Sequence, residues 1–150
     1  NNAATGNAAT GWGGGIYHYG IVTLINATFS NNSAAYGSGI YHDGLSTELT
    51  LINVLFWNSI LRTPPNNPDN AAVIEATVDP FVNAALPNGP DGIPRTADDG
   101  LRISPSATEV LNAGVNPGSY SQVPTTDIIG NPRPGTSNAN AEPGAYEFTP

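Results

Sequence analysis

A glycine-rich stretch in the second half of the chain holds oxygen-bearing side chains at short spacing. They are three carboxylates and one amide, from Asn88, Asp91, Asp98 and Asp99. Oxygen ligands on a tightly wrapped loop are what a hard cation such as calcium requires. The alternative is a run of turns in which each Asp side chain bonds to nearby backbone. Calcium is therefore the one cofactor that these residues suggest, and no cofactor is certain.

Two histidines, His18 and His42, fall at equivalent positions of an internal repeat. If the repeats stack, the two imidazoles stack as well and offer two ligands to a transition metal. Such a metal usually takes more ligands from His, Cys or carboxylates, and the chain has no third histidine and no cysteine. The sequence therefore favours two half-exposed histidines that hold no metal.

Candidate catalytic groups are scarce in the repeat region. Glycoside hydrolysis needs two carboxylates that face one cleft, and the only acids of the repeats are Asp43 and Glu48. A polysaccharide lyase would need a basic side chain, but the chain has no lysine and its arginines lie outside the repeats. Arg133 and Glu147 are expected to pair with backbone or with each other. No catalytic residue is predicted, and the chain is expected not to be an enzyme.

Aromatic residues are frequent in the same region. Their ring surface is enough for a platform on which sugar rings could stack, and the residues that offer it are Trp12, Tyr17, Tyr19, Tyr36, Tyr41 and Trp57. Trp57, Tyr41 and Tyr17 are the expected stacking residues. Repeated aromatic residues in stacked coils also serve as core or ladder residues. Both interpretations stay open.

These residues are positioned by a segment that occurs twice, at residues 13–33 and 37–59. The tetrapeptide GIYH recurs after 24 residues and the tripeptide LIN after 27, so the second copy carries three extra residues near Leu45, Ser46 and Thr47. Self-similarity at such a period is typical of solenoids. Runs of β-branched and aromatic residues between Gly and Asn indicate short strands and tight corners.

Stacked coils place equivalent residues about 4.8 Å apart. The expected neighbours are Ile16 and Ile40, Leu24 and Leu51, Phe29 and Phe56, and, as an amide ladder at a corner, Asn31 and Asn58. The sequence therefore predicts a β-solenoid with one dry interior.

The regular pattern ends after residue 58, and the prolines of residues 63–70 interrupt strand pairing. We therefore assign residues 1–62 to solenoid coils and residues 63–150 to a capping region packed on the same solenoid, in a single domain. Residues 1–12 are expected to form either a first coil or a frayed end. Residues 71–78 are expected to form either one more strand or a helical turn.

The composition excludes several classes of function. The net charge is −8 and charged residues make up 11% of the chain, so no basic surface is available for nucleic acid or an anionic membrane. No apolar run approaches the length of about eighteen residues that a membrane-spanning helix needs. Abundant Asn, Gly, Thr and Ser suit an exported protein. Because the chain begins inside what looks like a coil, we expect it to be a processed or C-terminal portion of something longer.

The repeats, with GGGIY followed by LINATFSNNS, resemble the coils of right-handed parallel β-helix repeat proteins of bacterial surfaces, the class that includes polymorphic outer-membrane-type autotransporters. The later blocks DPF, DDGL, NAG, GNPR and GAYE are similar, in this order, to the C-terminal region of large secreted bacterial β-helix proteins of the choice-of-anchor type. The resemblance covers residues 13–148 and departs from the family pattern at residues 106–111 and at Pro143. It implies an all-β, right-handed parallel β-helix with a loop-rich C-terminal cap, exported and usually without known catalysis.

These features together predict a non-catalytic structural module of a secreted or cell-surface bacterial protein. It would serve adhesion or self-assembly into an extracellular filament. Its partners would be a second copy at the open N-terminal coil, or the upstream coils of a longer chain, and possible glycans, but neither nucleic acid nor a membrane. The alternative is a carbohydrate-binding β-helix module stabilised by calcium.

Overall fold

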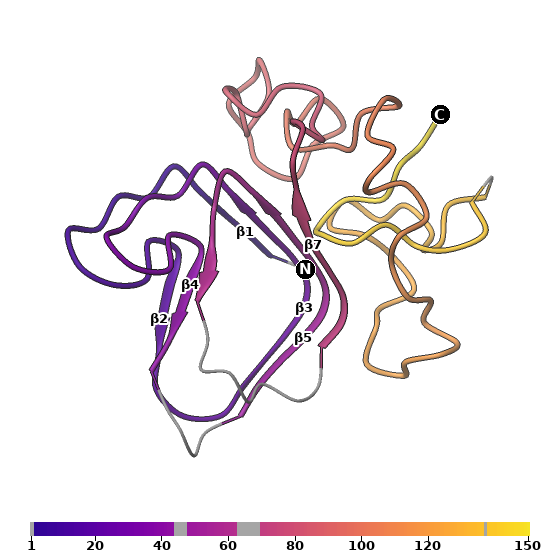
Figure 1. Cartoon of the computed structure of the whole chain (residues 1–150). Helices are drawn as coiled ribbons and strands as arrows, with labels where there is room; N and C mark the ends of the chain where they lie inside the picture. Colours follow the sequence, from indigo (N-terminus) through magenta and orange to yellow (C-terminus); the bar gives the residue numbers. More distant parts are fainter. Residues whose placement is uncertain (1, 44–47, 63–69, 137) are drawn as a thin grey trace.

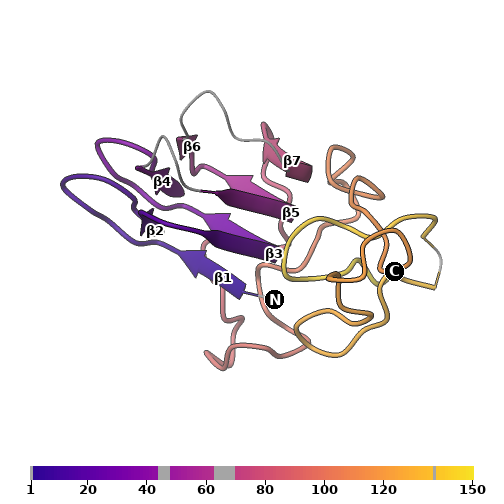
Figure 2. The same ribbon diagram turned by 90° about the horizontal axis from the view of Figure 1, so that it is seen from below.

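The computed structural model describes residues 2–43, 48–62, 70–136 and 138–150, and in these residues the protein is all-β with parallel strands (Figure 1). The strands are β1 (Asn2–Thr5), β2 (Ile16–His18), β3 (Val22–Ser30), β4 (Ile40–His42), β5 (Leu49–Trp57), β6 (Leu61–Arg62) and β7 (Asn70–Ala76). They form a four-stranded sheet in the order β1-β3-β5-β7 and a three-stranded sheet in the order β2-β4-β6. The expected β-solenoid is confirmed, because successive passes of the chain alternate between the two sheets and lie on top of one another (Figure 2).

The predicted stacking register is correct. Ile16 pairs with Ile40 across β2 and β4, and Leu24 with Leu51 and Phe29 with Phe56 pair across β3 and β5. The amide of Asn58 donates to the side-chain oxygen of Asn31 at 3.0 Å, which is the expected corner ladder. The three extra residues near Leu45, Ser46 and Thr47 lie outside the described residues.

Both open questions at the ends of the repeat region are answered by strands. Residues 2–12 form a coil rather than a frayed end, since β1 pairs with β3 and bridges join Ala8 to Ser33 and Trp12 to Tyr36. Residues 70–76 are strand β7, which pairs with β5. β7 lies in the range assigned to the capping region, yet it belongs to the four-stranded sheet.

The solenoid encloses an inner core made of stacked apolar side chains. The rings of Phe29 and Phe56 stack with centroids 5.0 Å apart and planes 12° from parallel. Gly15 and Gly39 make room for them: a Cβ at these positions would lie 2.9 Å and 2.8 Å from the two rings. The rest of the inner core is aliphatic and includes Ile40, Leu49, Leu51 and Val54.

A second, outer core lies between the outer face of the four-stranded sheet and residues 80–150, which run beside that sheet in both views (Figures 1 and 2). Leu55 on β5 is fully buried there against apolar residues of the cap, including Phe81, Leu101, Val110 and Tyr146. The cap therefore covers the side of the solenoid. Burial on both faces explains why β5 reads as the nearly continuous apolar run LINVLFW, with Asn53 as its one polar residue, whereas a strand with one solvated face would alternate.

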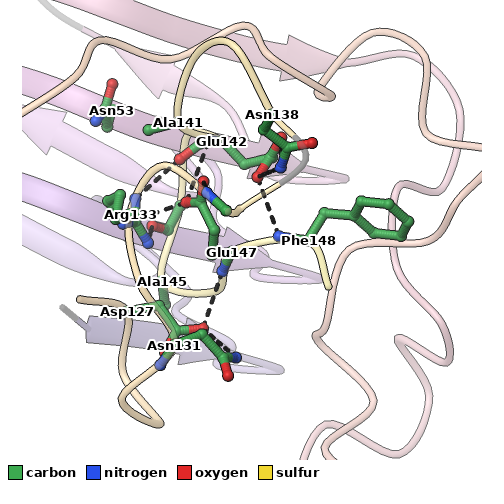
Figure 3. Close-up of polar contacts among 12 residues, drawn as sticks. Asn53, Asp127, Asn131, Arg133, Asn138, Ala141, Glu142, Ala145, Glu147 and Phe148 are labelled. Atoms are coloured by element: carbon green, nitrogen blue, oxygen red, sulfur yellow. Dashed lines mark hydrogen bonds and ion pairs between the residues drawn. The ribbon is translucent and has the colours of Figure 1, made fainter. Parts of the chain in front are cut away.

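The cap is held by a buried polar network around one arginine (Figure 3). Arg133 donates to the carbonyl oxygens of Glu142 and Gly144, and its Nε lies 3.4 Å from a carboxylate oxygen of Glu147. The expected pairing of Arg133 with Glu147 and with backbone is thus confirmed. Glu142 and Asp127 are also buried, and each carboxylate accepts hydrogen bonds from backbone N–H groups.

Burial dominates the protonation of this network. Burial is the main reason why the pKa of Glu147 is raised, and the neighbouring Glu142 raises it as well. Arg133 lowers it, and the resulting pKa is about 8. Burial also lowers the pKa of Arg133. In the described part of the chain, the guanidinium of Arg133 is therefore the one cation among three buried acids of this network, Glu147, Glu142 and Asp127.

No helix in the described part of the chain is long and apolar enough to cross a membrane.

Candidate functional site

Four aromatic side chains gather beside the three-stranded sheet, and we call them the aromatic cluster: Trp12, Tyr17, Tyr36 and Tyr41. Tyr17 on β2 and Tyr41 on β4 stack in register, with ring centroids 5.9 Å apart and planes 4° from parallel. Trp12 lies 6.4 Å from Tyr17 and 6.2 Å from Tyr41, tilted by 44° and 42°. Tyr36 is opposite Trp12 in the next coil. The parallel register of the coils thus collects rings that are far apart in sequence.

The aromatic cluster is largely exposed, and two charged side chains contact it: Asp43 at Tyr17 and Arg62 at Tyr36. Trp12 is 55%, Tyr17 52% and Tyr36 51% exposed. The hydroxyl of Tyr17 donates to Asp43 at 2.9 Å, and this hydrogen bond raises the pKa of Tyr17 above its ordinary value. The guanidinium of Arg62 lies 5.9 Å from the centre of the Tyr36 ring, a cation–π distance. The arrangement can stack a flat ligand and hydrogen-bond to it.

Trp57 lies elsewhere. It is on β5 of the four-stranded sheet and packs against the outer core, so the structure brings together Tyr17 and Tyr41 but not Trp57. Trp12 and Tyr36, which the sequence also offered for the platform, lie with Tyr17 and Tyr41 in the cluster. Their separation of 24 residues, the same as that of Ile16 and Ile40, places them in one column.

The acidic stretch expected to bind calcium has carboxylates that are already engaged. Asp99 is fully buried, and one of its oxygens accepts hydrogen bonds from the N–H groups of Arg95 and Thr96 at 2.6 and 3.1 Å and from the Tyr146 hydroxyl. Asp91 accepts from the N–H of Ile93 at 2.8 Å. These are the turn contacts given as the alternative to calcium.

The other two residues of that stretch do not complete a cage. Asp98 accepts a hydrogen bond from the Thr96 hydroxyl at 2.7 Å, and this bond lowers the pKa of Asp98. Asn88 is exposed and lines a hollow together with residues that include Arg95 and Tyr146. Within the described ranges, no group of three or more His, Asp or Glu side chains is placed to hold a metal ion. Calcium binding by Asn88, Asp91, Asp98 and Asp99 stays a prediction.

The two histidines stack as the repeat requires. The ring centroids of His18 and His42 are 5.2 Å apart, with planes 21° from parallel. His18 is half-buried, with Nε2 2.8 Å from the carbonyl oxygen of Gly20, and His42 is buried. The pair belongs to the stacking of the coils.

The β1 end of the solenoid, which we call the open end, is the second candidate site. β1 is the outermost strand of its sheet and pairs with β3 alone. The inner-core residues of this end, Ile16, Val22 and Leu24, are only half-buried, whereas their partners one coil above have no exposed surface. The inner core is therefore incompletely covered at this end.

A hollow of about 430 Å³ adjoins the open end. On the strand side it is lined by Ala3 and Thr5 of β1, and on the cap side by residues that include Pro87, Pro94 and Tyr146. The segment after β7 runs down past the stack to this level (Figure 2). The cap thus forms one wall beside an unpaired strand edge.

Comparison with known proteins gives one match, in the stacked repeats. A family model described as the Chlamydia polymorphic membrane protein (Chlamydia_PMP) repeat matches residues 26–43, from the middle of β3 to just past β4. No curated protein and no solved structure matches the chain. The match supports a repeat of the polymorphic-membrane-protein type, which is compatible with a surface-associated bacterial protein.

Proposed function

We propose that the chain is a non-catalytic structural module of an extracellular or cell-surface bacterial protein, and that it serves adhesion or self-assembly into an extracellular filament. The polymorphic-membrane-protein repeat supports a location at the bacterial surface and a role without catalysis. The stacked inner core and the cap on its side make a rigid body, which suits a structural role.

The observation that carries the assembly role is the unprotected edge of β1. Gly6 N–H donates to Ser30 O on the β3 side. Because N–H groups alternate in direction along a strand, those of Ala3 and Thr5 point to the free edge. Native proteins usually protect such an edge with charged side chains or proline, and β1, with the sequence NAAT, has neither.

The surroundings of β1 favour an added coil as well. No residue from 1 to 42 has a charged side chain, although the chain has a net charge of −8. An incoming coil would therefore meet no like charge on these residues and would cover the half-exposed Ile16, Val22 and Leu24. The coil comes from a second copy or from upstream coils of a longer chain. Stacking that repeats head to tail generates a filament.

The test is Thr5→Pro, which removes an N–H at the free edge without removing a bond to β3. We expect the unchanged chain to form concentration-dependent assemblies in sedimentation velocity and filaments in electron microscopy, and Thr5→Pro to sediment as a monomer with an unchanged melting temperature.

Thr10→Pro is the matched control, since Thr10 is exposed in the same coil but lies outside β1. It should assemble like the unchanged chain. A chain that remains monomeric at every concentration, or assembly that survives Thr5→Pro, would refute self-association through this edge.

A further inference from the structure

We propose that the aromatic cluster is a binding site for neutral, β-linked oligosaccharides. The inference rests on the proposed adhesive role and names the ligand class. The cluster lies beside the three-stranded sheet, and two of its members, Trp12 and Tyr17, belong to the first coil and to β2.

Exposure is the first argument. The inner core already has its own aromatic stack in Phe29 and Phe56, both buried, so the rings of the aromatic cluster are not needed to fill it. Side chains with an apolar body and a polar tip gather where one side of a ligand is apolar and the other is wet. Large exposed apolar groups that cluster on a surface mark interaction sites.

The geometry of Trp12 is the second argument. Tyr17 and Tyr41 stack on each other and so share their facing surfaces, but Trp12 is tilted by more than 40° to both. The indole does not lie flat on either ring and is 55% exposed, so part of its ring surface is open to solvent. The pyranose rings of β-linked glucose-type chains have equatorial hydroxyls and axial C–H groups, so their flat faces match such a ring.

Charge is the third argument. The cluster belongs to a region without charged side chains up to residue 42, on a chain of net charge −8. An acidic polysaccharide would be repelled by the molecule as a whole, whereas a neutral one is not. At the rim, Asp43 accepts hydrogen bonds and Arg62 donates them, which are the two partners that sugar hydroxyls need. A few polar groups around an aromatic surface are typical of small-molecule sites.

The test uses cellohexaose and chitohexaose as neutral probes and polygalacturonate as the acidic one. Isothermal titration calorimetry with the full chain should show binding of at least one neutral probe and none of polygalacturonate. Trp12→Ala should weaken that binding at least tenfold, because stacking on an indole is lost, and Trp12→Phe should restore part of it. Tyr120→Ala removes a partly exposed tyrosine on the cap, outside the cluster, and should leave binding unchanged.

Thermal unfolding of each variant shows that the fold is intact. Absence of binding by both neutral probes, preference for polygalacturonate, or unchanged affinity in Trp12→Ala would overturn the proposal. Thr5→Pro separates it from assembly: a monomeric Thr5→Pro chain that still binds the neutral probe supports both proposals. If the unchanged chain assembles and Thr5→Pro is monomeric, but neither binds a probe, the glycan site alone is refuted.

Discussion

At the scale of single residues, two asparagines of one column show what the cap adds to the solenoid. Asn26 and Asn53 both have a left-handed backbone, with φ of 51° and 53°, and both are fully buried. Asn53 donates to Val115 O at 2.9 Å and accepts from Val115 N–H at 2.7 Å. The amide of Asn26 has no hydrogen-bond partner among the residues that the structure describes. The same residue type therefore plays two roles: Asn53 binds the cap through Val115, whereas Asn26, one coil earlier, does not.

Substitution of each by glycine separates these roles, because glycine tolerates the left-handed backbone at both positions. Asn53→Gly should lower the free energy of unfolding by about 1–3 kcal/mol, since the half-buried N–H and C=O of Val115 lose their partners. Asn26→Gly should be close to neutral, because it removes a buried polar group that bonds to nothing. Urea denaturation of the two variants measures the difference, and equal losses would show that Asn53 does not hold the cap.

At the scale of elements, the segment 141–147 fastens the cap to two neighbouring strands (Figure 3). Gly144 N–H donates to Asn53 O on β5 at 2.8 Å, and Ala145 N–H donates to the Thr28 hydroxyl on β3 at 2.9 Å. Gly144 has a φ of +103°, and a Cβ there would lie 2.7 Å from the Thr28 oxygen. The segment can approach the sheet this closely only because residue 144 is glycine.

Gly144→Ala should therefore destabilise the protein by about 2–3 kcal/mol, from backbone strain and the clash together. Gly118→Ala is the matched control, since no atom lies within 4 Å of the added Cβ and its φ is not in the left-handed region. It should change the melting temperature little. Equal melting temperatures for the two variants would contradict the close packing of the segment on β3 and β5.

Elements also differ in how far the sequence predicts them. The register of β3 on β5 follows from the recurrence of LIN and of Phe29 at Phe56, because stacking makes sequence offset equal to spatial contact. The position of the cap does not follow, since the contact of Ala145 with Thr28 spans 117 residues and leaves no local pattern.

The candidate site was predicted in part for the same reason. Tyr17 and Tyr41 were found because they lie in the repeat, and their stacking is observed. Trp57 was assigned to the same platform, although alternation places it beside Leu55 on the outer face of β5, which the cap covers. The hint was the nearly continuous apolar run of β5, which is typical of a strand covered on both faces.

At the scale of the whole molecule, attachment of the cap depends on pH through Glu147. Its pKa of about 8 in the folded state is above the ordinary value of 4.5. The folded state therefore holds a proton that the unfolded state releases between these two values. The stabilisation is fully present below pH 4.5 and is lost as the pH rises to about 8.

The melting temperature should consequently fall between pH 5 and pH 8.5, and Glu147→Gln should flatten this slope because the side chain no longer titrates. Arg133, Glu142 and Asp127 face the same site and remain in the variant. Differential scanning calorimetry at several pH values measures the slope. An equally steep slope in Glu147→Gln would assign the dependence to another group.

The uneven distribution of charge along the chain also has a consequence for the salt concentrations at which the protein can work. All sixteen charged side chains lie at or after Asp43, so the coils that present β1 and Trp12 contribute no Coulomb term of their own to a contact. Salt weakens attractions between charges, with a Debye length of about 8 Å at 0.15 M, but it does not weaken hydrogen bonds between backbone groups or contacts between rings. Attachment of a neutral glycan through these coils should thus hold equally well in fresh water and in brine.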